Sequence, residues 1–220
     1  MAGHMALENL TVLDLTRVLA GPFCTMMLAD MGAHVIKIEI PGSGDDTRAY
    51  PPFREKNRNG ERESLYFANI NRNKKGVTLN LKTDAGKELF KRLVEQADIV
   101  VENYRPGVMD KLGLGYDVLQ QINPRIIYAA VSGFGSYGPY HLRPGYDILS
   151  QAMGGMMAIT GPQGGPPTRA GSALGDILGG LHVTIGILAA TNARTITGKG
   201  QPVDISLMAS VIAATENTAI

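Results

Sequence analysis

One carboxylate in the second half of the chain is placed where it could do chemistry. Asp176 is the only acidic residue between Asp147 and Asp204, and it follows small residues at 170–173 and Gly175. An apolar pattern with helical spacing begins directly after it. Asp is a good helix N-cap, and spacing alone favours that structural role. The second role is a carboxylate nucleophile, kept ionised by the helix end, with glycines leaving room for a bulky acyl group.

Basic residues recur near the expected strand ends and loops. Most exposed cations are only solvated, but around one sheet edge they could hold a polyphosphate through charge-assisted hydrogen bonds. These cations are Arg17, Lys74, Lys75, Lys82, Arg105, Lys111 and Arg143.

Two other reactive residue types favour structural roles. His182 stands alone among Leu and Val, without a second His or a carboxylate four residues on, so a core position is favoured over a metal ligand. Cys24 has no basic neighbour, which indicates a small buried hydrophobe.

The composition is that of an ordinary globular protein. The chain has 220 residues, a formal net charge of +1 and 44% hydrophobic residues, which suits one large or two small domains. The charge argues against nucleic-acid binding as the main activity. The single cysteine excludes an internal disulfide framework and a cysteine-based zinc site. The longest apolar run, 177–190, falls short of the roughly 18–20 residues of a membrane span, so we expect a cytoplasmic protein without membrane contact.

Alternating strand and helix patterns must position these residues. We expect a strand at 10–16, a loop at 17–22, a helix at 23–30 and a strand at 34–40, which together form a βαβ unit. A surface loop is expected at 41–62. Further strands are expected at 77–81, 98–103, 126–132 and 202–206, and further helices at 84–96, 117–122 and 146–157, after Asp176 and from 207. This alternation predicts an α/β, doubly wound, mostly parallel sheet that binds ligands at the carboxyl ends of its strands. The loop at 17–22 lacks the G-x-G-x-x-G fingerprint of dinucleotide-binding folds.

Several short motifs run nearly end to end from Leu7. They are Val12-Leu-Asp-Leu-Thr with Ala20-Gly-Pro, Val35-Ile-Lys-Ile-Glu with Gly42-Ser-Gly-Asp, Asn73-Lys-Lys, Leu79-Asn-Leu-Lys, Val101-Glu-Asn-Tyr-Arg-Pro-Gly, Gly145-Tyr-Asp, Gly175-Asp and Thr197-Gly-Lys-Gly-Gln. Through these motifs the chain resembles the family III CoA-transferases, the group that includes the formyl-CoA:oxalate and carnitine CoA-transferases.

The resemblance implies a Rossmann-like fold and a role for each matching residue. Asp176 would be the nucleophile of a reaction that moves CoA from an acyl-CoA donor to a carboxylic acid, through an aspartyl anhydride and an aspartyl-CoA thioester, with no metal. Coenzyme A, as substrate, would lie along Leu19, Ala20, Leu79, Asn80, Leu81, Lys82, Asn103, Tyr104, Arg105, Lys111, Arg143, Tyr146 and Asp147. Ile40 stands where some relatives carry an arginine near the adenine.

The residues at the two ends, together with the resemblance, imply a division of the chain. Residues 1–5 are expected to be a tag remnant, 6–206 the CoA-binding large domain that carries the nucleophile, and 207–220 the start of a helix leading into a missing C-terminal part. Such relatives are about twice as long and form interlocked homodimers, so the expected partners are a second copy, an acyl-CoA and a carboxylic acid.

Two alternatives stay open at this point. An α-methylacyl-CoA racemase would share the fold, but Tyr146 stands where racemases carry a histidine, and a phenol with a pKa of about 10 exchanges a Cα proton poorly near neutrality. The other alternative is an inactive CoA-binding fragment, in which binding loops are present without turnover.

Overall fold

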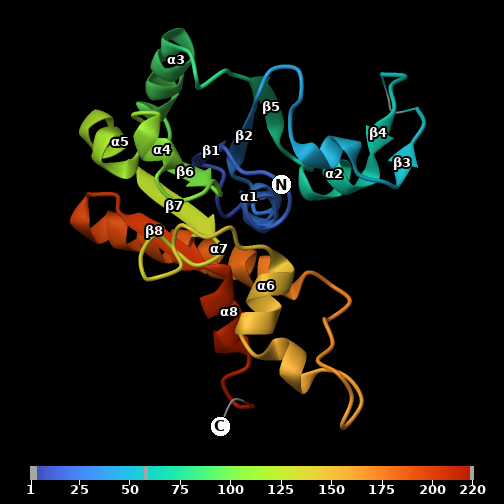
Figure 1. The fold of residues 1–220 in the computed structure, drawn as a ribbon. Coiled ribbons are helices and arrows are strands. Elements are labelled where there is room, and N and C mark those ends of the chain that lie inside the picture. Colours follow the sequence, from blue (N-terminus) through green and yellow to red (C-terminus); the bar gives the residue numbers. More distant parts are fainter. Residues whose placement is uncertain (1–3, 57–58, 219–220) are drawn as a thin grey trace.

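A single parallel sheet forms the centre of the molecule (Figure 1). The computed structural model describes residues 4–56 and 59–218, so residues 1–3 of the expected tag remnant and the last two residues of the expected 207–220 segment lie outside it. The six strands run in the order β5-β2-β1-β6-β7-β8, and every neighbouring pair is parallel. Their bounds are β1 Thr11–Asp14, β2 His34–Glu39, β5 Lys75–Thr78, β6 Ile99–Glu102, β7 Ile127–Ser132 and β8 Pro202–Ser206.

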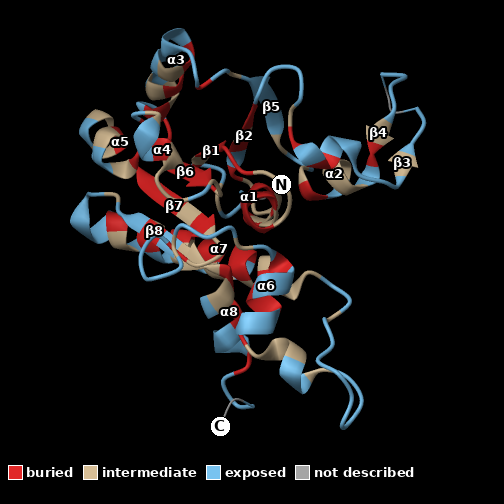
Figure 2. Cartoon of the chain, in the orientation of Figure 1, coloured by how far each residue is buried: buried red, intermediate tan, exposed pale blue. Residues whose placement is uncertain are grey.

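Helices cover both faces of this sheet, which confirms the predicted doubly wound α/β class. On one face α1 (Ala20–Asp30) and α7 (Leu174–Thr197) pack on side chains such as Val12 and Val101. On the other face α3 (Asp84–Val94), α4 (Val108–Lys111) and α5 (Tyr116–Ile122) cover Leu13 and Val100. Adjacent residues of one strand thus enter opposite cores, which is why most residues of the central strands β1, β6 and β7 are buried (Figure 2).

The order of the strands reverses between β1 and β6. From β1 the chain builds outward through β2 and β5, and then returns to the other side of β1 to add β6, β7 and β8. Loops that leave the carboxyl ends of β1 and β6 therefore diverge, and such a switch point is where open α/β sheets bind ligands.

Smaller elements flank the sheet at its two ends. The 3-10 turn η1 (Asp46–Ala49), the hairpin β3 (Phe53–Arg54) with β4 (Glu63–Ser64), and α2 (Leu65–Ile70) form an arm beside β5 (Figure 1). At the other end α6 (Asp147–Met153), η2 (Met156–Ile159) and α8 (Leu207–Ala214) gather beside α7.

Three expectations for secondary structure were wrong. The strand expected at 77–81 is β5 at Lys75–Thr78, because an edge strand paired only with β2 has no buried pattern to fix its bounds. The helices α2 and α4 were not predicted, since six and four residues are too few to show a helical repeat in the sequence. The loop expected at the surface over 41–62 contains the buried residues Asp45 and Thr47.

The helix after Asp176 also differs from expectation. It runs from Leu174 to Thr197. By length and composition alone this helix could cross a membrane, whereas the apolar run at 177–190 was expected to be too short for that. Its packing against α1, β7 and β8 accounts for the apolar sequence. Gly180 allows this contact, because a Cβ there would lie 2.8 Å from the Ala20 carbonyl oxygen. The helix is not buried on all sides, since Ile185 is 63% exposed.

Candidate active site at the switch point

A cavity of about 580 Å³ opens at the switch point. The loop after β1, the loop after β6, the end of β7 and the segment before α6 supply most of its wall. Asp176, in the first turn of α7, also lines it. Segments from across the chain therefore converge on one carboxylate.

A buried ion pair supports the loop after β1. The Asp14 carboxylate at the end of that strand accepts hydrogen bonds from the Thr16 backbone N–H (2.9 Å) and from Lys74 Nζ (3.0 Å). Burial disfavours ionisation of Asp14, but Lys74, Lys37 and hydroxyl donors outweigh it and lower its pKa to about 2. Lys74 is thus committed to Asp14, with a side chain only 1% exposed, and the expectation that it could hold a phosphate was wrong.

A second buried pair holds the next residues of the same loop. Lys37 Nζ donates to the Thr16 carbonyl oxygen at 2.8 Å and pairs with the Asp45 carboxylate at 3.0 Å. Asp45 also accepts the Val18 N–H at 3.3 Å. Val18 has φ 68°, a left-handed conformation that is strained for a β-branched residue and persists only where its surroundings enforce it.

Asn103 joins the loops that leave β1 and β6. Its side-chain oxygen accepts the Arg17 N–H at 2.9 Å, and its Nδ2 donates to the Arg17 carbonyl oxygen at 2.7 Å. The Arg17 guanidinium lies 3.5 Å from the Asp46 carboxylate and 5.8 Å from the centre of the Tyr104 ring. Arg17 is one of the cations that the sequence predicted could hold a polyphosphate, and it lines the cavity.

Asp176 occupies the third position of α7, after Leu174 and Gly175, and does not cap the helix. The residue before the helix is Ala173, which makes no side-chain cap, so the favoured N-cap role was wrong. Burial first, and then the neighbouring Asp147 charge, raise the pKa of Asp176 to about 7, while Arg169 opposes them. A pKa of about 7 leaves this group only partly ionised near neutrality, in contrast to the expectation that the helix end keeps it ionised.

Asp147 supplies the missing cap from α6. Its Oδ1 accepts the Gly175 N–H at 2.8 Å, and its side chain is largely buried. A Cβ on Gly175 would lie 2.1 Å from Ser150 Oγ, so α6 and α7 meet at a glycine.

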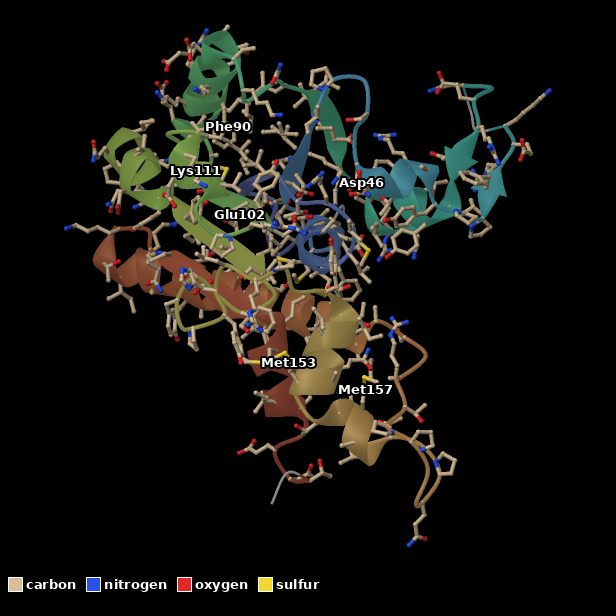
Figure 3. The ribbon with its side chains drawn as sticks, in the orientation of Figure 1. Asp46, Phe90, Glu102, Lys111, Met153 and Met157 are labelled. Atoms are coloured by element: carbon tan, nitrogen blue, oxygen red, sulfur yellow. The ribbon has the colours of Figure 1, made fainter. Side chains whose placement is uncertain are left out.

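The structure brings together many, but not all, of the residues expected to hold CoA. Those that line the cavity with Asp176 are Leu19, Ala20, Asn103, Tyr104, Arg105, Arg143 and Tyr146. Outside its wall are Leu79, Asn80, Leu81, Lys82, Lys111 and Asp147. The four residues at 79–82 follow β5 at the sheet edge, and Leu81 is buried in the core. Figure 3 shows Lys111 on α4, away from Asp46 at the cavity.

Three aromatic or acidic residues of the arm were missed as site residues. Asp46 and Tyr50 line the cavity, and Tyr66 packs edge-on against Tyr50 at 5.7 Å. Burial first, and then the Asp176 charge, raise the pKa of Tyr66 to about 12. The motif Gly42-Ser-Gly-Asp, directly before these residues, was the sequence signal that could have marked them.

The two residues predicted to be structural lie outside the cavity wall. Cys24 is buried as predicted, and burial raises its pKa to about 12. His182 is half-buried on α7, with Nδ1 2.8 Å from the Leu178 carbonyl oxygen.

Comparison with known proteins identifies the family. The family model described as CoA-transferase family III matches residues 7–220. The chain is 48% identical over 98% of its length to an acyl-CoA transferase of Fusarium pseudograminearum, and covers 48% of that protein. It is 49% identical over 94% of its length to acetyl-CoA:oxalate CoA-transferase of Acetobacter aceti, and covers 52% of it.

A solved structure gives the same result. The chain superposes on a CAIB/BAIF family protein from Brucella suis with a TM-score of 0.94 and 44% identity, covering 99% of this chain and 57% of that one. The chain thus spans about half the length of the curated relatives it matches. Matches of this extent, together with the predicted fold and motifs, show that the chain belongs to CoA-transferase family III.

Proposed function

We propose that this chain carries the nucleophile and most of the CoA-binding wall of an enzyme that transfers CoA from an acyl-CoA to a carboxylic acid. The observation that carries the proposal is the position of Asp176, whose carboxylate lines the switch-point cavity between the loops after β1 and β6. The relatives' names support CoA transfer, since the protein of Acetobacter aceti acts between acetyl-CoA and oxalate.

The proposed reaction begins with attack by the ionised Asp176 carboxylate on the thioester carbonyl of the donor. This attack forms a mixed anhydride and releases CoA as a thiolate. The thiolate then attacks the Asp176 carbonyl carbon, which gives an aspartyl-CoA thioester and frees the donor acid as a carboxylate.

The second half of the reaction reverses these steps with a new acid. The acceptor carboxylate attacks the aspartyl-CoA carbonyl and releases the CoA thiolate again. That thiolate attacks the acyl carbon of the new anhydride, so the products are the acceptor acyl-CoA and a regenerated Asp176 carboxylate. No net proton is consumed, so the proposed reaction requires no general base.

Cations around the cavity suit the anionic part of CoA. Arg17, Arg105 and Arg143 all line the wall, and the Arg143 guanidinium lies 4.3 Å from the centre of the Tyr140 ring. Guanidinium groups bind phosphate oxygens in a bidentate manner. We propose that the phosphates of CoA lie along this rim while the thioester reaches Asp176.

The test uses the protein at the full length of its relatives, because half of each relative lies outside the matched region. Succinyl-CoA is incubated with oxalate, glutarate and mesaconate in turn, and formation of the new acyl-CoA is followed by chromatography. We expect transfer by the wild type and a loss of at least about 10³-fold in Asp176→Asn, since the nucleophile is absent.

Asp117→Asn is the matched control, because Asp117 is an exposed carboxylate in the first turn of α5 and lies outside the cavity wall. We expect it to keep wild-type transfer. Undiminished transfer by Asp176→Asn would contradict the proposal, and so would exchange of the acyl α-proton without any transfer of CoA.

A further inference from the structure

We propose that Asp147, Gln151 and Arg169 form a clamp that positions Asp176, in which Arg169 partly neutralises the Asp147 charge beside the nucleophile. This inference rests on the proposed role of Asp176 as the nucleophile. We call these three residues the α6 clamp, although Arg169 comes from the loop that leads to α7. None of the three lines the cavity, so they are positioning residues that act through Asp176.

Asp147 is the centre of the clamp. Its Oδ1 accepts the N–H of Gly175, the residue directly before Asp176, at 2.8 Å. A short, buried hydrogen bond to a carboxylate fixes the backbone from which Asp176 extends, and it satisfies one of the free donors of the first turn of α7. Asp147 therefore fixes the backbone position from which the Asp176 side chain extends.

Gln151 ties the preceding loop to the same point. Its Nε2 donates to both Asp147 oxygens at 3.0 and 2.9 Å and to the Ser172 carbonyl oxygen at 3.2 Å. Its Oε1 accepts the Ala170 N–H at 3.0 Å. Gln151 is completely buried, and its two bonds to Asp147 are shielded from water.

Arg169 closes the clamp from the solvent side. Its Nε and Nη2 donate to Asp147 Oδ2 at 3.1 and 2.8 Å, while its side chain stays 44% exposed. The Asp147 side chain is only 9% exposed, and Arg169 is the cation that pairs with it. Arg169 is thus the member of the clamp that can be changed with the least disturbance of packing.

The clamp also sets the electrostatic field at Asp176. Burial and Asp147 raise the pKa of Asp176, and Arg169 lowers it. The other titratable or charged groups that face the cavity or Asp176 are Tyr66 from α2, Tyr50 and Asp46 from the arm, Arg17 from the loop after β1, Tyr104 and Arg105 from the loop after β6, and Arg143 and Tyr146 before α6. Loss of the Arg169 charge leaves Asp147 uncompensated next to the nucleophile.

The test compares Arg169→Gln with the matched control Arg169→Lys, which keeps the charge. The Asp176 carboxyl is titrated by carbon-13 NMR in the full-length protein and assigned by its absence in Asp176→Asn. We expect the midpoint in Arg169→Gln to rise by about half a unit or more, because a nearby cation favours the charged form. The midpoint of Arg169→Lys is expected to stay near that of the wild type.

A third variant is expected to shift the Asp176 titration midpoint in the opposite direction. Asp147→Asn removes the like charge, and we expect its Asp176 midpoint to fall. The rate of CoA transfer at saturating substrate, measured across pH, should move in parallel. Arg169→Gln should lose about threefold or more near pH 6.5 and recover toward the wild-type rate near pH 8.5, with unchanged affinity for CoA.

The outcomes separate the clamp from the proposed function. An unmoved midpoint in folded Arg169→Gln, or a loss of rate by the same factor at every pH, would overturn the clamp. If the wild type transfers no CoA but the midpoints shift as expected, the clamp stands and the nucleophile role fails. If Arg169→Gln does not fold, the Arg169→Lys and Asp147→Asn titrations decide, since a purely structural role predicts no opposite shift in Asp147→Asn.

Discussion

The buried position of Asp176 lowers the stability of the fold at neutral pH. Its pKa is raised to about 7 in the folded chain, from 3.8 without the fold. The folded state therefore binds a proton more tightly than the unfolded state, so stability falls as pH rises from about 4 to about 7. Above about pH 7 the ionised, buried carboxylate lowers the free energy of unfolding.

Asp176→Asn should therefore stabilise the protein in a pH-dependent way. We expect a gain on the order of 2 kcal/mol or more in the free energy of unfolding at pH 8, because the amide carries no charge. At pH 4 we expect almost no difference, since the carboxyl is then protonated. Urea unfolding at both pH values measures this, and an equal effect at the two would contradict the raised pKa.

At the scale of single residues, the sequence singled out Asp176 as a candidate but did not predict its position in α7 or its neighbours. Isolation among apolar and small residues singled it out, and family motifs supplied the role of nucleophile. Its position inside the first turn of α7 depends on Asp147, which caps the helix across a gap of 28 residues in sequence from Gly175. Local spacing carries no information about such a cap.

At the scale of elements, the meeting of α6 and α7 at Gly175 predicts a sharp effect of one methyl group. Gly175→Ala would place a Cβ 2.1 Å from Ser150 Oγ, so we expect a loss of about 1–3 kcal/mol of stability and a displaced nucleophile. Thermal unfolding and the succinyl-CoA transfer assay measure both effects.

The matched control for this change is Gly171→Ala. Gly171 is exposed, and no atom lies within 4 Å of its added Cβ, so we expect little change in either measurement. Equal behaviour of the two alanine variants would show that the contact between α6 and α7 does not constrain the site.

The buried pair beneath the loop after β1 gives a second prediction for elements. Lys74→Met leaves the Asp14 carboxylate buried without its closest cation, and we expect a loss of about 3–5 kcal/mol. The wild-type Asp14 pKa is lowered to about 2, so its stabilising contribution is complete above about pH 4 and is lost as pH falls toward 2.

A double variant tests whether the charge, and not the packing, causes this loss. Lys74→Met with Asp14→Asn removes both charges, and we expect it to recover part of the stability in urea unfolding. A double variant as unstable as the sum of the two single variants would contradict the pairing.

Elements were predictable where burial imposed a pattern. The central strands β1, β6 and β7 lie in the predicted segments, because both of their faces are covered and most of their residues are apolar. The edge strand β5 and the short helix α2 were displaced or missed, because their pairing and packing depend on β2 and on the arm.

At the scale of the whole molecule, the cavity wall could not be predicted from local pattern. Arg17, Asp46, Asn103, Arg143 and Asp176 come from five separate segments that only the strand order brings together. The rule that open α/β sheets bind ligands at the carboxyl ends of their strands pointed to the loop after β1, and the resemblance added the loop after β6 and the segment before α6. The contribution of the arm, with Asp46 and Tyr50, appeared only in three dimensions.

Apolar side chains remain exposed on the α7 side of the molecule. Ile148 on α6, Ile185 on α7 and Ile212 on α8 are 51%, 63% and 47% exposed (Figure 2). The chain spans about half the length of its curated relatives, so we expect the remaining half or a second copy to cover these residues.

Thiol labelling tests this expectation. We expect Ile185→Cys to react with a polar maleimide at least about tenfold more slowly in a protein of the relatives' full length than in this chain alone, because burial protects thiols. Arg92→Cys on α3 is the control and should react equally in both. Cys24 is buried with its pKa raised to about 12, so it adds little background. Equal labelling of Ile185→Cys in both proteins would contradict coverage of this face.

Peptide mass spectrometry of the full-length protein after its half-reaction with succinyl-CoA tests directly whether Asp176 is the nucleophile. Succinyl-CoA is added without an acceptor, the reaction is quenched with hydroxylamine, and the peptide that spans 170–194 is sequenced. We predict an aspartyl hydroxamate at Asp176, absent without succinyl-CoA and absent in Asp176→Asn. An unmodified Asp176 in a protein that is transferring CoA would contradict the central claim.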